Sequence, residues 1–473
     1  MKKNISKCAK INFIFKLAKS FIILFVIFIF SSCSVDKKTT KKELLLHSSA
    51  SKIQSSIQED KIAKRSAVEN FVNSLSEEEK ISQLFLINLE GNTTFTPVER
   101  TSDIYKNKKQ TSQKKSSEKK ALVPGGYIFF SYNFASTPEE IISFTLSIKE
   151  YCKKNNLVPP YLSLDQEGGE VNRLRGITSV LPSNERVAQC LTPEKAKQLY
   201  SLQAIQIKNL GFNMNIAPVS EICTDDNKEF LSGRSYGNRK QVLSYASAAV
   251  TSYEQNKIGT VLKHFPGNTN TDPHTGLPEI DLSQEELESL SVEPFSLLIN
   301  YSPSAVLMSH ARTLAHDKNT PADLSRYWVS QKLIDEMNFT GLVICDDIFM
   351  AALEKNGFPP EEASVKAIEA GVDVIMISEK RFANVAEVLL EKSAEDEIFK
   401  EKLFNAECKV IEYKIKAGIL ENKKISVDEE PLKYEVKLAE EKEMPINEKI
   451  KSFENAKKEG NLLYEKYFRG VKR

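Results

Sequence analysis

Eight short apolar runs recur between residues 84 and 377, and a polar or helix-periodic segment follows each of them. The runs are Leu84–Asn88, Tyr127–Ser131, Tyr161–Leu164, Asn213–Ala217, Thr260–Lys263, Ala305–Met308, Leu342–Cys345 and Val372–Ile377. Short apolar runs that alternate with helical segments predict a mostly parallel sheet in an α/β protein. Eight such units over about 310 residues predict a (β/α)8 TIM-type barrel. The structural alternative is an open doubly wound sheet, but no glycine-rich dinucleotide turn follows the first run.

The first 33 residues have the organisation of a secretory signal. Six lysines and no acidic residue occupy positions 1–20, and an unbroken apolar run, Phe21–Phe30, follows them. The next residues, Ser31-Ser32-Cys33, resemble a bacterial lipobox, which implies that Cys33 is lipidated and becomes the mature N-terminus. We therefore predict a lipoprotein signal peptide at residues 1–33 and a membrane-anchored protein of the cell envelope, outside the cytoplasm. An uncleaved membrane anchor is the alternative.

Composition divides the rest of the chain into three parts. Residues 34–65 are rich in Lys, Ser, Thr and Gln, which predicts a flexible tether with some helix. Residues 66–394 contain the apolar runs and form the predicted barrel domain, and Ser76–Glu79 has the capping-box pattern that opens a helix. Residues 395–473 are charged and helical in period, for example at Tyr434–Glu443, which predicts a short helical C-terminal extension.

Charge and cysteine usage narrow the possible partners. The net charge is +1, which gives no reason to expect a nucleic acid as partner. Two of the seven cysteines lie in the leader, and the other five are widely spaced, with no pair at metal-ligand spacing. No two histidines lie at ligand spacing on a helix. We therefore predict neither a metal site nor any other cofactor.

The stretch from Lys263 to His274 concentrates reactive side chains. An apolar run leads into Lys263 and His264, and a loop rich in Pro, Gly, Asn and Thr then carries Asp272 and His274. Imidazole changes its charge near neutral pH, and an acid two residues away can orient it for acid/base catalysis. The alternative is a loop with a capping Asp and a solvated His, and the residues alone favour neither interpretation.

This stretch resembles the signature of family 3 glycoside hydrolases, in their β-N-acetylglucosaminidase branch. The resemblance covers roughly residues 70–385 and implies that Asp272 and His274 form a general acid/base dyad on a mobile loop. The chain departs from the family pattern at Asn268-Thr269, where His-Gly is usual, and its loop is slightly shorter. It also has Glu221 where an Asp usually follows the strand of residues 213–217.

Two adjacent acids follow the apolar run of residues 341–345. Neighbouring side chains on an extended chain point in different directions, so we expect one acid to face the barrel axis and the other to anchor the loop. The stretch resembles the nucleophile motif of the family, which implies that Asp346 is the nucleophile and that Asp347 fills a variable position. An N-cap role for Asp346 is the alternative. His310, in a further family-like stretch, is as readily structural as functional.

Sugar binding is assigned by the same resemblance. The Asp-Gln-Glu-Gly-Gly turn at residues 165–169 and the Ser-Gly-Arg-Ser-Tyr-Gly loop at residues 232–237 are similar to the sugar-contacting segments of the family. Paired glycines allow a tight turn and close approach of a ligand. The predicted substrate-binding residues are Asp165, Arg173, Arg234, Lys263 and His264. For Arg173, pairing with a carboxylate in a structural role is equally compatible with the sequence.

The resemblance implies a retaining exo-β-N-acetylglucosaminidase (a β-N-acetylhexosaminidase) that removes terminal β-linked N-acetylglucosamine from cell-wall or related glycans. Asp346 would form a covalent glycosyl-enzyme, and His274, oriented by Asp272, would act as acid and then as base. The expected partners are a carbohydrate substrate and, through the lipid anchor, a membrane. The alternatives are a β-glucosidase or β-xylosidase of the same family, and a lipoprotein that binds glycans with little or no turnover.

Overall fold

The computed structural model describes residues 37–105, 119–272, 276–425, 432–440 and 444–469 of the 473-residue chain. The chain divides into two compact units. The first covers residues 1–65 and 428–432, and its described part is mainly the first portion of helix α2 (Lys37–Ser74), which includes most of the predicted tether. The second covers residues 66–427 and 433–473 and contains the barrel.

The structure does not describe the predicted leader. Residues 1–33, with Cys33, lie outside the described residues, so the signal peptide and its lipidation stay predictions. Among the described helices, none is both long and apolar enough to cross a membrane.

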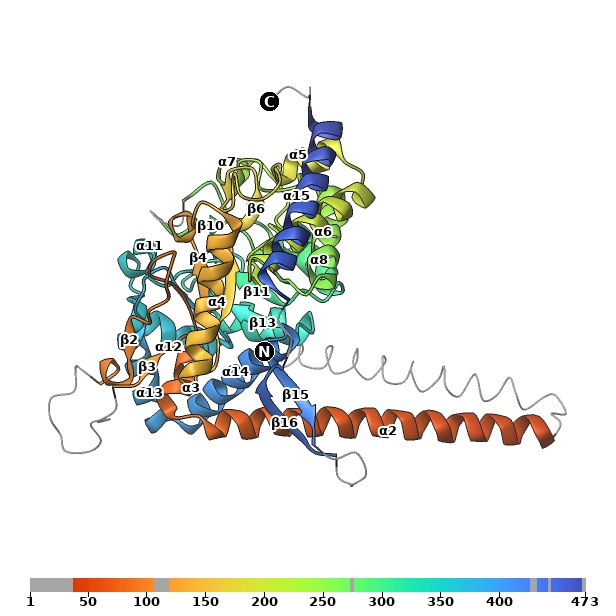
Figure 1. The fold of residues 1–473 in the computed structure, drawn as a ribbon, viewed down its shortest axis with the longest axis vertical. Coiled ribbons are helices and arrows are strands. Elements are labelled where there is room, and N and C mark those ends of the chain that lie inside the picture. Colours follow the sequence, from red (N-terminus) through yellow and green to blue (C-terminus); the bar gives the residue numbers. More distant parts are fainter. Residues whose placement is uncertain (1–36, 106–118, 273–275, 426–431, 441–443, 470–473) are drawn as a thin grey trace, which may run out of the picture. The chain divides into compact units, whose positions relative to one another are not determined.

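Eight parallel strands form the central sheet of the second unit (Figure 1). They are β1 (Phe85–Asn88), β4 (Gly126–Phe129), β5 (Tyr161–Leu164), β8 (Met214–Asn215), β9 (Gly259–Phe265), β11 (Ala305–Met308), β13 (Leu342–Ile344) and β14 (Ile375–Ile377). From β1 to β13 each strand pairs with the next in chain order, β14 pairs with β1, and an isolated bridge between Ile344 of β13 and Val374, directly before β14, completes the ring. The ring is therefore closed, and the predicted (β/α)8 barrel is confirmed, with a strand in each of the eight apolar runs.

Helices alternate with these strands. The main ones are α3 (Glu77–Ser82), α4 (Pro138–Lys154), α6 (Pro193–Asn209), α8 (Arg239–Gln255), α10 (Glu293–Ile299), η5 (Tyr327–Glu336), α12 (Pro360–Ala370) and α13 (Ala383–Glu395). The predicted capping box is present: Ser76 Oγ accepts from the Glu79 backbone N–H at 3.2 Å, and the Glu79 carboxylate accepts from the Ser76 N–H at 3.1 Å. Such reciprocal bonds satisfy the free N–H groups of a first helical turn and fix where the chain enters the barrel.

The core has two layers, one on each side of the sheet. On β1, Leu86 belongs to the cluster inside the barrel, while Phe85 and Ile87 belong to the larger cluster between strands and helices. This alternation follows from the two-residue period of a strand. Gly126 is needed inside the barrel, because a Cβ at this position would lie 2.2 Å from the ring of Tyr161.

The C-terminal region corrects one expectation. After helix α14 (Glu397–Lys416), strands β15 (Leu420–Lys424) and β16 (Tyr434–Leu438) pair antiparallel, so the predicted helix at Tyr434–Glu443 is wrong where β16 forms. In β16 apolar and charged residues alternate, and Val436 is buried against Leu420 and the end of α2. A two-residue period buries one face of a strand, and here it outweighs the helical preference of Glu and Lys. The chain returns to helix in α15 (Ile446–Phe468).

Candidate active site

The predicted site residues lie at the carboxyl ends of barrel strands. Asp165 directly follows β5, Lys263 and His264 lie near the end of β9, and Asp346 follows β13 by two residues. The carboxyl ends of the strands of a (β/α)8 barrel meet at one face, where such barrels carry their active sites. The barrel therefore brings together segments that are more than 80 residues apart in sequence.

Buried charges alternate in sign across this face. Lys263 Nζ lies 2.9 Å from Asp165 Oδ1 and 2.6 Å from Glu167 Oε1. Arg234 donates through Nε and Nη2 to the two oxygens of Glu167, at 2.8 Å each. Lys263 and Glu167 are almost completely buried, so each charge depends on its neighbours rather than on water. Three of the predicted sugar-binding residues are thus linked, and Glu167 is the group that joins Lys263 to Arg234.

The two carboxylates of this row, Asp165 and Glu167, are ionised at neutral pH. Burial acts to raise the pKa of Asp165, but the nearby Lys263 and Arg173 outweigh it and the pKa is lowered. Burial likewise opposes ionisation of Glu167, yet Lys263 and Arg234 lower the pKa of Glu167 to about 2. Both carboxylates are therefore ionised acceptors, which is the state that binds sugar hydroxyls most strongly.

Arg173 contacts a carboxylate and an aromatic ring. Its Nη2 lies 3.3 Å from Asp165 Oδ2, and its guanidinium carbon lies 5.4 Å from the ring centroid of Phe130, in cation–π geometry. The pairing that the sequence left open is therefore present. Because this pairing involves the predicted sugar-binding Asp165, it does not by itself separate a structural from a binding role.

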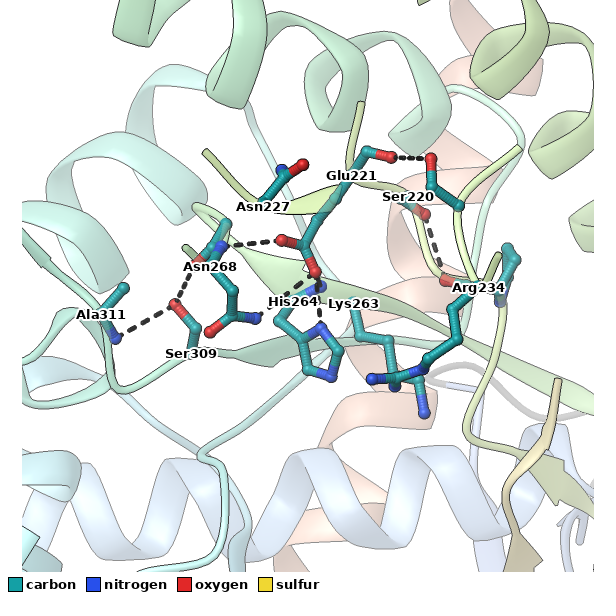
Figure 2. Close-up of polar contacts among 12 residues, drawn as sticks. Ser220, Glu221, Asn227, Arg234, Lys263, His264, Asn268, Ser309 and Ala311 are labelled. Atoms are coloured by element: carbon teal, nitrogen blue, oxygen red, sulfur yellow. Dashed lines mark hydrogen bonds and ion pairs between the residues drawn. The ribbon is translucent and has the colours of Figure 1, made fainter. Parts of the chain in front are cut away.

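His264 is held by Glu221 (Figure 2). Its Nδ1 lies 2.7 Å from Glu221 Oε1, and the same carboxylate accepts from the backbone N–H of Asn268 through Oε2, also at 2.7 Å. All three residues are buried. Glu221 and Asn268, two departures from the family pattern, therefore contact each other, and Glu221 also contacts His264.

The two adjacent acids after β13 have different environments. Asp347 Oδ1 accepts from the backbone N–H groups of Phe349 at 3.1 Å and Ser378 at 3.0 Å, so Asp347 anchors the loop. Asp346 accepts only one described bond, from the Asp347 backbone N–H to its Oδ1 at 2.9 Å. This division agrees with the expectation that one acid anchors the loop, and it leaves Oδ2 of Asp346 without a hydrogen bond among the described residues.

His310 forms a buried pair beside these acids. Its Nδ1 lies 2.9 Å from Asp323 Oδ2, and its Nε2 lies 3.0 Å from the backbone oxygen of Asp347. Burial opposes the charge, but Asp323 and then Asp346 raise the pKa of His310 to about 9. An acceptor oxygen lies near each ring nitrogen, which favours the imidazolium, although Nδ1 and Asp323 Oδ2 form a close ion pair without hydrogen-bond geometry. His310 therefore brings a positive charge to the loop that carries Asp346 and Asp347.

The predicted acid/base loop is only partly described. His274 lies outside the described residues, while Asp272 is exposed and its backbone oxygen accepts from the Gly276 N–H at 3.0 Å. The loop starts from a fixed position, because Asn270 donates through its backbone N–H to the Asp226 oxygen at 2.6 Å. The roles of Asp272 and His274 stay predictions.

A cavity of about 710 Å³ lies beside this loop. Its lining comes from residues 221–227, residues 266–271 and the segment between residues 279 and 295. In the described part of the chain, no group of three or more His, Cys, Asp or Glu side chains is arranged to hold a metal ion.

Three carboxylates that support the site were not assigned a role from the sequence. Glu167 lies two residues after Asp165, in a stretch similar to the family, and Glu221 stands where the family usually has an Asp. These positions were the available signal for Glu167 and Glu221, whereas Asp323 first attracts attention through its contact with His310. Their partners, however, lie from 13 to 96 residues away and become neighbours only through the closed barrel.

Comparisons with known proteins agree with this geometry. The model of the Glycosyl hydrolase family 3 N terminal domain matches residues 76–411. Beta-hexosaminidase A of Pseudoalteromonas piscicida is 27% identical over 273 residues, which are 54% of this chain and 45% of that protein. The beta-hexosaminidase of Haemophilus influenzae is 28% identical over 263 residues, 54% of this chain and 73% of that protein. The match thus spans about half of the first relative and about three quarters of the second.

A solved structure shows the same architecture. The glycoside hydrolase family 3 β-N-acetylglucosaminidase of a Paenibacillus species superposes with a TM-score of 0.62 at 25% identity, over 81% of this chain and 68% of that one.

Proposed function

The chain belongs to glycosyl hydrolase family 3, and from that membership we propose that it is a retaining, exo-acting β-N-acetylglucosaminidase. The observation that carries the proposal is the set of groups at one face of the barrel: ionised Asp165 and Glu167, the cations Lys263 and Arg234, and Asp346, which follows strand β13 of the same barrel. The names of the Pseudoalteromonas, Haemophilus and Paenibacillus proteins support the choice of sugar.

Binding in this proposal uses the alternating charges. Ionised Asp165 accepts hydrogen bonds from sugar hydroxyls, and Lys263 and Arg234 donate to hydroxyl oxygens. Because each charge is already paired, a sugar exchanges partners without leaving a buried charge uncompensated. The substrate is terminal β-linked N-acetylglucosamine in cell-wall or related glycans.

The reaction proceeds in two displacements. Asp346 attacks the anomeric carbon through Oδ2, because Oδ1 already accepts the Asp347 N–H at 2.9 Å. His274, oriented by Asp272, donates a proton to the departing glycosidic oxygen. Water then gives a proton to His274 and attacks the anomeric carbon, which releases N-acetylglucosamine and restores the Asp346 carboxylate. An imidazole carries no negative charge in its basic form, so it does not repel an anionic cell-wall fragment.

The decisive measurement is release of nitrophenol from 4-nitrophenyl N-acetyl-β-glucosaminide, with Asp346→Asn as control. We expect turnover by the wild type and a loss of about 10³-fold or more in the variant, which keeps its thermal midpoint. A fluorinated N-acetylglucosaminide should leave a covalent adduct on the peptide that contains Asp346. Activity on the β-glucoside alone would favour the other enzymes of the family. Sugar binding without turnover or adduct would instead indicate a glycan-binding protein.

The proposed location rests on the leader sequence. Lipidation of Cys33 would hold the barrel at the envelope membrane, where cell-wall glycans are accessible, with residues 34–65 as tether. The full-length protein should appear in the membrane fraction of cells and should incorporate labelled fatty acid. Cys33→Ser should abolish the label. A wild type that incorporates no fatty acid would contradict this location.

A further inference from the structure

Glu221 joins a predicted sugar-binding residue to the start of the acid/base loop. It follows β8 by six residues, and its side chain lies between His264, near the end of β9, and Asn268, in the loop that leaves β9 (Figure 2). The side chain is buried, and both of its oxygens are used. No role has been given to Glu221 in the proposed reaction.

The contacts divide between the two oxygens. Oε1 lies 2.7 Å from His264 Nδ1, and it also accepts from the His264 backbone N–H at 3.3 Å and from the Asn268 side-chain amide at 3.4 Å. Oε2 accepts from the Asn268 backbone N–H at 2.7 Å. A carboxylate is an acceptor only, and at least three of its four partners are obligate N–H donors, so a proton on His264 Nδ1 completes the set.

The surroundings hold Glu221 itself in place. Its backbone oxygen accepts from Ser235 Oγ at 2.6 Å, and the preceding Ser220 N–H donates to the backbone oxygen of Lys263 at 2.7 Å. On the other side, Ser309 Oγ donates to the backbone oxygen of Gly267 at 2.8 Å. Three strand ends thus fix the position of the carboxylate relative to His264.

We propose that Glu221 is a positioning residue that fixes His264 and the first residue of the acid/base loop with a single carboxylate. The proton of His264 stays on Nδ1, which turns the other ring nitrogen, Nε2, toward the sugar as an acceptor. The 2.7 Å bond to the Asn268 N–H sets where the loop to Asp272 begins. This inference rests on the proposed function, since it assigns Glu221 to the same sugar and the same leaving-group chemistry.

Glu221→Gln separates the two contacts. A glutamine has one acceptor oxygen and one amide NH₂, so it bonds either His264 Nδ1–H or the Asn268 N–H and places a donor against the other. Removal of a group that orients a metal ligand typically costs about 10- to 100-fold in affinity or activity, and we expect an effect of similar size for a carboxylate that orients a site histidine. We expect kcat/KM to fall about 10-fold for the nitrophenyl glycoside and about 100-fold for N,N′-diacetylchitobiose. The sugar that leaves from the chitobiose is a poorer leaving group than nitrophenol, so its departure depends more on a positioned acid.

Glu254→Gln is the matched control. Glu254 Oε1 also accepts four hydrogen bonds, from Thr260 and Ser304, but at the amino ends of β9 and β11, away from the site. This variant should lower the thermal midpoint and leave kcat, KM and the ratio between the two substrates unchanged. Glu221→Asp keeps the charge but is one methylene shorter, so it should retain one contact and show an intermediate loss.

Binding of N-acetylglucosamine, measured by calorimetry, makes the test independent of turnover. We expect Glu221→Gln to bind the sugar about 10-fold more weakly than the wild type, and Glu254→Gln to bind it normally. A folded Glu221→Gln protein with wild-type affinity for the sugar and an unchanged ratio of kcat/KM between the two substrates would overturn the inference. Full activity of Glu221→Asp would show that the carboxylate does not need to hold His264 and Asn268 at the same time. A wild type that binds the sugar but does not hydrolyse it would refute the proposed function, while weaker binding by Glu221→Gln would still support the positioning of His264.

Discussion

At the scale of residues, the mouth of the barrel is organised by alternating charges rather than by isolated pairs. Arg234, Glu167, Lys263 and Asp165 follow one another with contacts between 2.6 and 2.9 Å. A buried charge is stable only when neighbouring charges and hydrogen bonds replace its lost hydration. Removing an inner member of the row therefore affects two partners at once.

Glu167→Gln tests this arrangement. The variant leaves Arg234 without its bidentate partner and Lys263 with Asp165 alone, in a buried environment. We expect the free energy of unfolding, from urea denaturation at pH 7, to fall by about 3–5 kcal/mol.

A surface pair of the same chemistry is the control. Arg239 binds Glu293 through two bonds of 2.7 Å, but both side chains are about half exposed. Glu293→Gln should cost less than about 1 kcal/mol. Equal losses in the two variants would mean that burial does not determine the contribution of these pairs.

The residue scale also marks what could be foreseen from the sequence. The stretches that contain Asp165, Lys263 and Asp346 were identifiable, because they follow apolar runs that become strands. The partners were not, since Glu167 contacts a lysine 96 residues away and Glu221 contacts a histidine 43 residues away. Pairing across such separations depends on which strand ends are adjacent, and local sequence does not encode that.

At the scale of elements, one buried histidine joins three segments. His310 follows β11, Asp323 belongs to the 3₁₀ turn η4 (Ala322–Leu324), and Asp347 follows β13. The pKa of His310 is raised to about 9, against about 6.5 in an unfolded chain. The folded state therefore binds the extra proton between these pH values, and its stabilising effect is complete below pH 6.5 and lost as pH rises through 9.

The double variant His310→Gln/Asp323→Asn removes this titration and keeps amide groups that can bond each other. We expect the difference in unfolding free energy between wild type and variant to shrink as pH rises from 6.5 to 9.5, measured by urea denaturation at each pH.

His316→Gln serves as control, because His316 stacks on Tyr327 at 4.5 Å between ring centroids. In this control the pH dependence of the wild type should persist. A constant difference between the wild type and the double variant across this range would show that His310 carries no extra proton in the folded protein.

The elements also show where periodicity misleads. The pattern of residues 434–443 suits a helix by composition, yet Tyr434–Leu438 forms β16, because pairing with β15 buries Val436. Composition gives the propensity of an isolated segment, whereas a hairpin depends on a second strand that packs against the same core.

At the scale of the whole molecule, closure of the ring brings the end of the barrel back to its beginning. Lys414, on α14, is completely buried, and its Nζ donates to Oε1 of Gln83, two residues before β1, at 2.5 Å. The eight strands were predictable from apolar runs alone. This junction was not, because a lysine in a charged helix is normally solvated and nothing in the local sequence distinguishes this one.

Lys414→Met tests the energetic consequence of this junction. Burial lowers the pKa of Lys414 to about 7, against about 10.4 in an unfolded chain. Between these values the unfolded state binds more protons, so this lysine makes the wild type more stable as pH rises from 7 to 10. The methionine variant lacks that dependence, although it leaves the Gln83 oxygen without a donor at a cost of about 1–3 kcal/mol. Its stability relative to wild type should therefore be highest at pH 6 and should fall steadily toward pH 10 in urea denaturation.

Lys416→Met, a half-exposed neighbour on the same helix, should show no such trend. A relative stability of Lys414→Met that does not change with pH would mean that the buried amine keeps its proton throughout, held by Gln83 more strongly than burial disfavours it.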